Sequence, residues 1–299
     1  MTTVIGLAPN ERGAAAVHLG SMLARSTGDD VVVATVVPTP WPPDPYRTDL
    51  EYLALQQAAA EQALTRARTQ IGTDLAVELV LHHARSVSSG LLEVARERHA
   101  SVVALGSSSG GLLGLVSLGG VAERILHSAD IPVTLAPKGF DPQTTNARVS
   151  RITVAFGRAD RDSDLLHTAA GVAQDIGAAL RVACFAVRPV TSAAEPVAAG
   201  AERLVVDEWS KHLEGDIAHV LSSTQGGSVA TRVETVVGQG TSWADALADV
   251  AWADREVLAV GTSSSAISRF FLGSHASKIV RSAPVPVFLM PRSLMEHQG

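Results

Sequence analysis

Short apolar runs alternate with longer amphipathic stretches along the first half of the chain. The apolar runs predict strands, and the amphipathic stretches predict helices. The expected strands cover residues 4–7, 31–37, 77–81, 102–105 and 133–136. The expected helices cover residues 12–26, 50–70, 87–98 and 121–127. Strands that alternate with helices of this length form right-handed βαβ units, so this half predicts a parallel sheet with helices on both faces.

The second half repeats the same alternation. Its expected strands cover residues 152–156, 180–187, 232–236, 257–260 and 285–290, and its expected helices cover residues 163–176, 202–223, 243–251 and 276–281. The letters repeat as well: SVVALGSSSG (101–110) matches EVLAVGTSSS (256–265), and LGGVAERILHSADIPVTLAP (118–137) matches LGSHASKIVRSAPVPVFLMP (272–291). A repeat of this length is a whole domain rather than a short solenoid unit.

The repeat predicts two domains, which we call copy one (residues 1–138) and copy two (residues 151–293). The polar segment between them predicts a linker over residues 139–150, and residues 294–299 are expected to form a tail. Gly28 and Gly177 end the first expected helix of each copy, as glycine commonly does at a helix C-terminus. Ser242 precedes another expected helix and suits its N-cap.

Composition narrows the class of protein. A length of 299 residues fits two domains of ordinary size. The net charge of −6, without a cluster of lysine and arginine, argues against a nucleic-acid partner. There is no basic segment followed by a long apolar one at the N-terminus, and no apolar run reaches the ~20 residues that span a bilayer. We therefore expect a cytoplasmic protein without a membrane partner. Cys184, the single cysteine, is expected to be a small buried residue in a strand.

The candidate site lies in the loops that follow the first and fourth strands. In open parallel sheets, ligands bind beyond the carboxyl ends of the strands, where the strand order reverses. In copy one, the segment from Gly106 to Gly120 is rich in glycine and serine and directly precedes a helix. Free N–H groups, a helix N-terminus and hydroxyls can together cradle phosphate; a solvated flexible loop is the alternative. Neither the P-loop nor the dinucleotide fingerprint is present.

This arrangement resembles the universal stress protein (UspA) family in its tandem two-domain form. The family pattern is Gly, two residues, Gly, nine residues, then Gly-Ser or Gly-Thr, a helix and a Pro-Val strand, and the resemblance covers nearly the whole chain. It implies an α/β fold of two Rossmann-like (adenine nucleotide alpha hydrolase-like) domains, each a five-stranded parallel sheet in the order 3-2-1-4-5. It also implies a stress-response protein that binds ATP or another adenine nucleotide, with no metal required.

The resemblance assigns binding positions in each copy. In copy one they are Gly106, Ser107, Ser109, Gly110, Gly119 and Gly120, together with Ala8 and Val37 on the first two strands. In copy two they are Gly261, Thr262, Ser264, Gly273 and Ser274. Ser109 and Ser264 stand where the pattern has its second glycine. Copy one lacks the final hydroxyl, and the segment in copy two is one residue shorter.

The family also places an aspartate at the end of the first strand. The matching positions are Ala8 and Gly157, whose side chains cannot accept a hydrogen bond; Asp160 and Asp162 follow and are candidates to substitute. A lost hydrogen bond costs about 1 kcal/mol, and a non-glycine residue at positive φ roughly another 1 kcal/mol. Two or three such departures lower affinity by about 30- to 1000-fold. We therefore expect weak or lost ATP binding, with copy one the better candidate.

No Ser-His-Asp set, Cys-His set or carboxylate pair is positioned by a motif, so we predict no catalytic residue and expect that the protein is not an enzyme. The leading hypothesis is a non-catalytic binding or regulatory protein of the stress response. One alternative is a pure interaction scaffold that has lost nucleotide binding. The other is a slow ATPase or another nucleotide-using enzyme.

Tandem members of the family pair their copies as a pseudo-dimer through the last strands, here residues 133–136 and 285–290. A homodimer of two chains is a further expectation. The proline-rich segment 38–47 is expected to form a surface loop or lid over the site. His82 and His83 are adjacent on a strand and point to opposite faces, which favours a surface pair over a metal site. His18 is expected to be an ordinary helical histidine.

Overall fold

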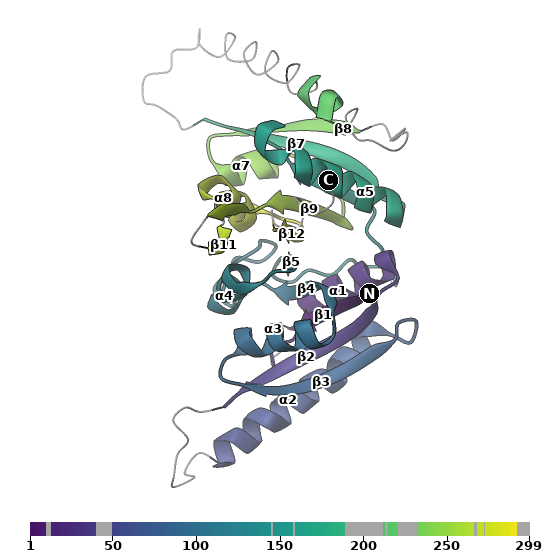
Figure 1. The fold of residues 1–299 in the computed structure, drawn as a ribbon, viewed down its shortest axis with the longest axis vertical. Helices are drawn as coiled ribbons and strands as arrows, with labels where there is room; N and C mark the ends of the chain where they lie inside the picture. The colour runs from purple at the N-terminus through teal and green to yellow at the C-terminus, as the bar shows by residue number, and fades with distance from the viewer. Residues whose placement is uncertain are drawn as a thin grey trace.

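The computed structural model describes residues 1–9, 13–39, 50–144, 146–157, 159–188, 212, 215–220, 233–265, 268–271 and 273–291. One ten-stranded sheet runs through the molecule, with helices on both faces (Figure 1). Its strand order is β3-β2-β1-β4-β5-β12-β9-β6-β7-β8. The strands of each copy are therefore neighbours, and the two copies meet at β5 and β12.

Copy one forms the first half of this sheet. Its strands are β1 (Thr2–Gly6), β2 (Asp30–Pro38), β3 (Val77–Ala84), β4 (Ala100–Gly106) and β5 (Val133–Ala136). Its helices are α1 (Ala14–Thr27), α2 (Leu50–Ile71), α3 (Val87–Glu97) and α4 (Gly120–Ser128). All neighbouring strands within copy one are parallel. The expected α/β class and the order 3-2-1-4-5 are confirmed.

Copy two repeats the order. Its strands in the sheet are β6 (Arg151–Ala155), β7 (Ala179–Val187), β8 (Glu234–Gly240), β9 (Glu256–Gly261) and β12 (Val287–Met290). Its helices are α5 (Ala159–Ile176), α7 (Trp243–Ala248) and α8 (Ser274–Ser282). The helix expected over residues 202–223 lies mostly outside the described residues. Within this range the structure describes His212 and residues 215–220, and these are helical. The expected lid over 38–47 lies largely outside them too, since only residues 38 and 39 are described.

Some expected boundaries in copy two are wrong. Helix α5 begins at Ala159 rather than at residue 163. Strand β12 begins at Val287 rather than at residue 285, because Pro286 has no N–H to donate to a ladder. The glycine–serine loop expected after β9 is instead an antiparallel hairpin of β10 (Ser263–Ser265) and β11 (Ser268–Phe271). Aromatic residues such as Phe270 and Phe271 favour extended backbone.

The seam between the copies is the antiparallel pair β5 and β12. Leu135 lies opposite Val287, and Val133 lies opposite Leu289. The buried Thr134 hydroxyl donates a hydrogen bond to the Val287 carbonyl across the seam at 3.1 Å. Because this pair is antiparallel while every other pair in the sheet is parallel, the carboxyl ends of the strands in the two copies point to opposite edges of the sheet.

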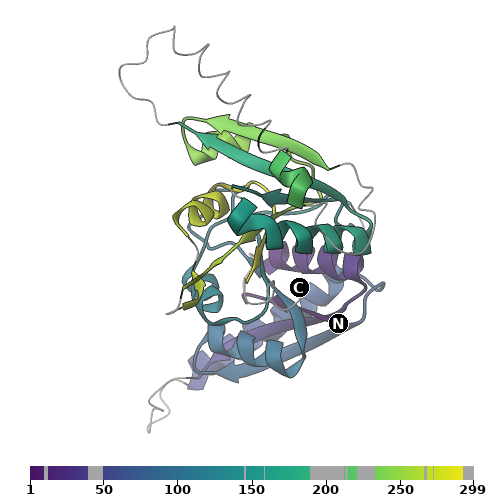
Figure 2. The same ribbon diagram turned by 45° about the horizontal axis from the view of Figure 1, so that its top comes forward.

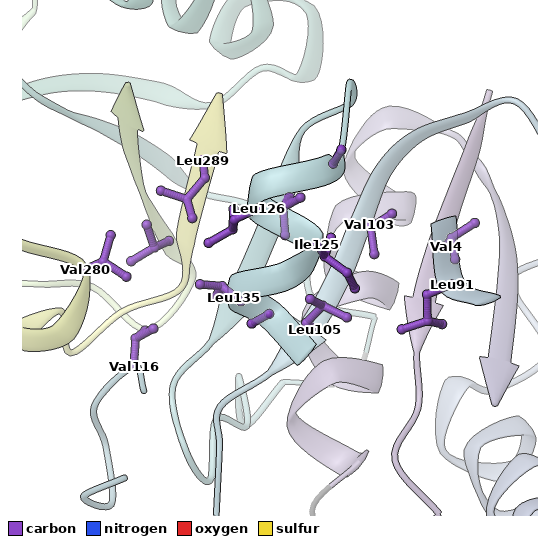
Figure 3. Packing of buried hydrophobic residues seen from close by; sticks show 14 of the residues in the cluster. Val4, Leu91, Val103, Leu105, Val116, Ile125, Leu126, Leu135, Val280 and Leu289 are labelled. Atoms are coloured by element: carbon purple, nitrogen blue, oxygen red, sulfur yellow. The ribbon is translucent and has the colours of Figure 1, made fainter. Parts of the chain in front are cut away.

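The hydrophobic core is shared across the seam. Helices α3, α4, α7 and α8 cover one face, and a single apolar cluster lies beneath them. At its centre, Val116 and Leu135 of copy one lie near Val280 and Leu289 of copy two (Figure 3). On the opposite face, α1 and α5 lie side by side (Figure 2), and both contribute to a second cluster. The buried thiol of Cys184 belongs to this second cluster, as expected of a small apolar residue.

Local signals explain several helix ends. Gly28 ends α1 in the left-handed conformation at φ +76°, and Gly177 follows α5 at φ +67°. Helices α3 and α7 both begin with a capping box, made by Ser86 with Ser89 and by Ser242 with Asp245. In both boxes, the first side chain accepts from the backbone N–H three residues on, and the second bonds back to the cap residue.

Each copy carries a buried polar group at the amino edge of its strands. In copy one, the buried Asp29 carboxylate accepts hydrogen bonds from Ser101 at 2.7 Å and from Thr3 at 3.3 Å. In copy two, Glu256 is 0% exposed and Arg181 is 2% exposed. Arg181 donates to the Glu256 carboxylate at 2.5 Å, and Arg151 donates to it at 2.7 Å. Burial lowers the pKa of Arg181, against the opposing charge of Glu256.

Candidate functional site

The candidate site of copy one lies where the strand order reverses. Strand β1 lies between β2 and β4 in the sheet. After β1 the chain continues into α1 on one face of the sheet, and after β4 it continues into α4 on the other face. The segments beyond these strand ends are residues 7–13, of which 7–9 and 13 are described, and the segment we call loop one, residues 107–119. The matching segment of copy two, residues 262–273, we call loop two. The seam places loops one and two at opposite edges of the sheet.

Loop one is closed by its own backbone hydrogen bonds. The Ser108 N–H donates to the Ser117 carbonyl at 2.9 Å, and the Gly111 N–H donates to the Ser108 carbonyl at 3.3 Å. The Leu115 N–H donates to the Leu112 carbonyl at 3.2 Å. These N–H groups are the donors that a phosphate cradle would turn toward its ligand. A phosphate would therefore have to displace these bonds.

The serine hydroxyls of loop one are also engaged. The Ser107 hydroxyl donates to the Ala136 carbonyl on β5 at 2.7 Å and accepts from the Ser117 N–H at 2.9 Å. The hydroxyls of Ser108 and Ser117 share a hydrogen bond of 2.7 Å. Serines expected to donate to a phosphate thus hold the loop to the sheet and to itself.

Two glycines of loop one let the backbone pass close to serine side chains of the same loop. A Cβ atom added to Gly111 would lie 2.4 Å from the Ser117 Cβ, and one added to Gly119 would lie 2.9 Å from the Ser108 Cβ. A Cβ atom added to Gly110 or Gly120 would meet no other atom within 4 Å. The positive φ in this loop falls on Gly114, at +79°, and Ser109 is not among the described residues with positive φ. The expectation of backbone strain at Ser109 is therefore wrong.

Lys138, two residues after the end of β5, completes the closure of loop one. Its backbone N–H donates to the Leu115 carbonyl at 3.0 Å, and its carbonyl accepts from the Gly114 N–H at 2.9 Å. Its ammonium donates to the carbonyls of Ser109 and Gly111 at 3.2 and 2.8 Å. Lys138 was not among the positions predicted from the sequence, although a cation two residues past the Pro-Val strand was a signal.

Loop two starts like loop one and then diverges. Gly261 ends β9, and the buried Thr262 bonds the Met290 carbonyl through both its N–H and its hydroxyl, at 3.1 and 3.3 Å. The chain then enters the hairpin, which takes in Ser264 as part of β10. Gly273 is the N-cap of α8 without a side-chain cap, and Ser274 is the exposed first residue of that helix.

The ends of the first strands differ between the copies. In copy one, Ala8 is exposed just beyond β1, and Val37 is buried near the carboxyl end of β2. Neither residue has an acidic side chain. In copy two, the Gly157 N–H donates to the Asp162 carboxylate at 2.8 Å. Asp162 also contributes, after burial, to raising the pKa of Cys184 to about 12. Asp162 therefore lies where the carboxyl ends of β6 and β7 meet; nothing is described of the Asp160 side chain.

Both loops cross the seam. The Val116 N–H of loop one donates to the Ala283 carbonyl of copy two at 3.1 Å. Strand β11 of loop two contacts α4 of copy one. Arg281 on α8 forms an ion pair with Glu123 on α4 at 3.3 Å. Each candidate loop is therefore positioned partly by the other copy.

The histidines singled out from the sequence have ordinary neighbours. His82 pairs with Glu93 at 2.8 Å, and His18 in mid-α1 donates to the Phe140 carbonyl at 3.1 Å. Within the described residues, no group of three or more His, Cys, Asp or Glu side chains is placed to hold a metal ion. In the same part of the chain, no helix combines the length and apolar character needed to cross a bilayer.

The geometry defines a class: a tandem Rossmann-like protein with a glycine–serine segment after the fourth strand of each copy. The Universal stress protein family model matches residues 1–137 and 149–291. Universal stress proteins of Mycobacterium tuberculosis and Mycobacterium bovis are 35% identical over 296 residues, covering 97% of this chain and 100% of theirs. The chain belongs to the universal stress protein family.

Solved structures agree on the fold. A universal stress protein from Archaeoglobus fulgidus has a TM-score of 0.60 at 17% identity, covering 97% of this chain and 98% of its own. A putative universal stress protein from Pseudomonas aeruginosa has a TM-score of 0.57 at 13% identity, covering 99% of this chain and 95% of its own. These two likenesses extend over both copies.

Proposed function

We propose that this protein is a non-catalytic binding member of its family, in which loop one takes ATP or another adenine nucleotide weakly. The observation that carries the proposal is the closure of loop one. The N–H groups of Ser108 and Gly111 and the hydroxyl of Ser107 already have partners within the protein. A nucleotide phosphate has to replace these bonds before it gains any of its own.

The cost of that replacement sets the expected affinity. An intramolecular hydrogen bond contributes about 0.5–1.5 kcal/mol net, so releasing two or three costs about 1–4.5 kcal/mol. This lowers affinity by about 5- to 2000-fold relative to an open loop. We therefore still propose weak nucleotide binding, as the sequence led us to expect. We attribute part of the low affinity to the closed loop and none of it to strain at Ser109.

Loop two supports the same proposal for a different reason. The segment that would wrap a phosphate is a hairpin held against α4 of the other copy. Asp162 and Ser274 supply an acid and a hydroxyl at this end of copy two. A nucleotide at loop two would need the hairpin to leave α4, so we place the weak site in copy one.

An interaction scaffold is the second candidate function. It is favoured by the tip of loop one, where Leu112 and Leu113 are 73% and 78% exposed. Large contiguous apolar patches mark contact surfaces for other proteins, and these two leucines would lie at the centre of such a patch. Pairing of two whole chains stays a prediction, which analytical ultracentrifugation tests.

Calorimetric titration of the full chain with ATP and adenosine, with and without magnesium, tests the proposal. We expect weak binding of one nucleotide per chain, without a magnesium requirement. Tight magnesium-dependent binding to both copies contradicts it. Absence of binding, with no small molecule released from the denatured fresh protein in mass spectrometry, supports the scaffold. Phosphate release that is lost in Gly119→Val supports an enzyme.

A further inference from the structure

Lys138 is a cation fixed against loop one. Hydrogen bonds from its backbone to Leu115 and Gly114 hold its main chain against the loop. Its side chain then returns to the same loop, where it reaches the carbonyls of Ser109 and Gly111. The backbone contacts hold the main chain of Lys138 against the loop, and the two carbonyls hold its ammonium there.

No acidic side chain among the described residues pairs with this ammonium. In the described part of the chain, its partners are two backbone carbonyls and no carboxylate. An ammonium has three N–H donors, and two of them are used here. A positive charge with a remaining donor is therefore held beside the glycine–serine segment.

The same segment lies against the start of α4. Ser108 is close enough to Gly119 that a Cβ on Gly119 would approach the Ser108 Cβ to 2.9 Å. Gly119 is the N-cap of α4 and has no side-chain cap. The Lys138 ammonium, on the carbonyls of Ser109 and Gly111, thus sits on the part of the loop that abuts this helix start.

The repeat offers a matching cation in copy two. The sequence LAPK, which ends at Lys138, corresponds to LMPR, which ends at Arg292. Arg292 lies outside the described residues, so the comparison is one of sequence position. A cation therefore follows the last strand of both copies, although the two loops have diverged.

We propose that Lys138 receives the phosphate group of a nucleotide bound to loop one. In the ligand-free protein its ammonium latches the loop by holding two carbonyls. When a nucleotide binds, the ammonium donates to the phosphate instead, and the loop N–H groups are released with it. This inference rests on the proposed function and names the residue that recognises the anionic part of the ligand.

Calorimetry with ATP, adenosine and inorganic triphosphate separates this role from a structural one. The variants are Lys138→Met and Lys138→Arg, with Lys278→Met on the exposed surface of α8 as the matched control. We expect Lys138→Met to weaken binding of ATP and triphosphate about tenfold or more, because a charge-assisted hydrogen bond is lost. Adenosine affinity should stay within about twofold, since adenosine has no phosphate. Lys138→Arg should restore most of the ATP affinity, and Lys278→Met should change nothing.

Each other outcome overturns the inference. An equal loss of ATP and adenosine affinity would show that Lys138 only stabilises loop one and does not bind phosphate. Unchanged ATP affinity in Lys138→Met removes the role of Lys138 and leaves the proposed nucleotide binding intact. A wild-type protein that binds neither ATP nor adenosine overturns both proposals. Cooperative thermal unfolding of each variant shows that the comparison is made between folded proteins.

Discussion

Loops one and two begin with the same contact and end in different structures. The Ser107 hydroxyl bonds the Ala136 carbonyl, and the Thr262 hydroxyl bonds the Met290 carbonyl, so each loop is tied to the last strand of its own copy. Beyond that anchor, loop one folds back on itself under Lys138, whereas loop two extends into a hairpin. The anchor belongs to the fold, and the remainder of each loop is free to diverge.

The losses in the two copies are complementary. Copy one keeps the loop length and a fixed lysine but has Ala8 at the end of its first strand. Copy two keeps an acid, Asp162, at that strand end and the Ser274 hydroxyl at the start of α8, but its loop is a hairpin. Neither copy therefore matches the family's sequence pattern at every position.

The largest expected difference between the copies lies at the amino edge of the sheet. Glu256→Gln leaves the buried Arg181 without its counter-charge, so unfolding free energy should fall by about 3–5 kcal/mol. In copy one, Asp29→Asn should cost about 1–3 kcal/mol, because its hydrogen-bond partners are neutral hydroxyls and the N-terminal ammonium, 3.9 Å away, is largely exposed. Urea denaturation measures both. Glu234→Gln, at an exposed partner of Arg151, is the control and should cost less than about 1 kcal/mol. Equal effects of Glu256→Gln and Glu234→Gln would contradict this assignment.

The packing of loop one gives the next largest effect. Gly111→Ala should destabilise copy one by about 1–3 kcal/mol, because the new methyl group would overlap Ser117. Gly110→Ala, with open space at its Cβ position, is the matched control and should be close to neutral. Thermal unfolding of the two variants gives the comparison. A loop that tolerates both equally is not closed as described.

Removal of the shared anchor should distinguish the two loops by a smaller amount. Ser107→Ala removes the bond to Ala136 and also leaves the Ser117 N–H without its acceptor, so we expect a loss of about 1–2 kcal/mol. Thr262→Val keeps the backbone bond from residue 262 to Met290, so about 0.5–1 kcal/mol is expected. Denaturant titration provides the values. The reverse order would show that loop two depends more on its anchor.

The smallest expected difference is a pH dependence at the capping boxes. Hydrogen bonds from Thr241 and then Ser242 lower the pKa of Asp245. A lowered pKa in the folded state contributes stability above the ordinary aspartate range, and that stability is lost as pH falls through the folded value. The melting-temperature difference between wild type and Asp245→Asn should therefore shrink between about pH 7 and about pH 3. Ser89→Ala in copy one should give a constant difference, since its capping box is uncharged.

The hydrophobic pattern predicted most strands and helices, and the family resemblance predicted the strand order and the seam, but neither predicted the structure of the loops. Apolar runs such as residues 133–136 are marked by their length and by the proline before them, so β5 is found where it was expected. Closure of loop one could not be predicted, because Lys138 enters from beyond β5 and acts on carbonyls that no side-chain pattern reveals. The contact of Asp162 with Gly157 depends on the start of α5, which lies earlier than the amphipathic pattern indicated.

Amide hydrogen exchange in the ligand-free protein directly tests whether loop one is closed by its own hydrogen bonds. The N–H groups of Ser108, Gly114, Val116 and Ser117 all donate within the protein. We expect these four N–H groups to exchange far more slowly than in an unstructured peptide, and ATP at saturating concentration to change their exchange rates. Exchange at the rate of an unstructured peptide in the absence of ligand would contradict a closed loop.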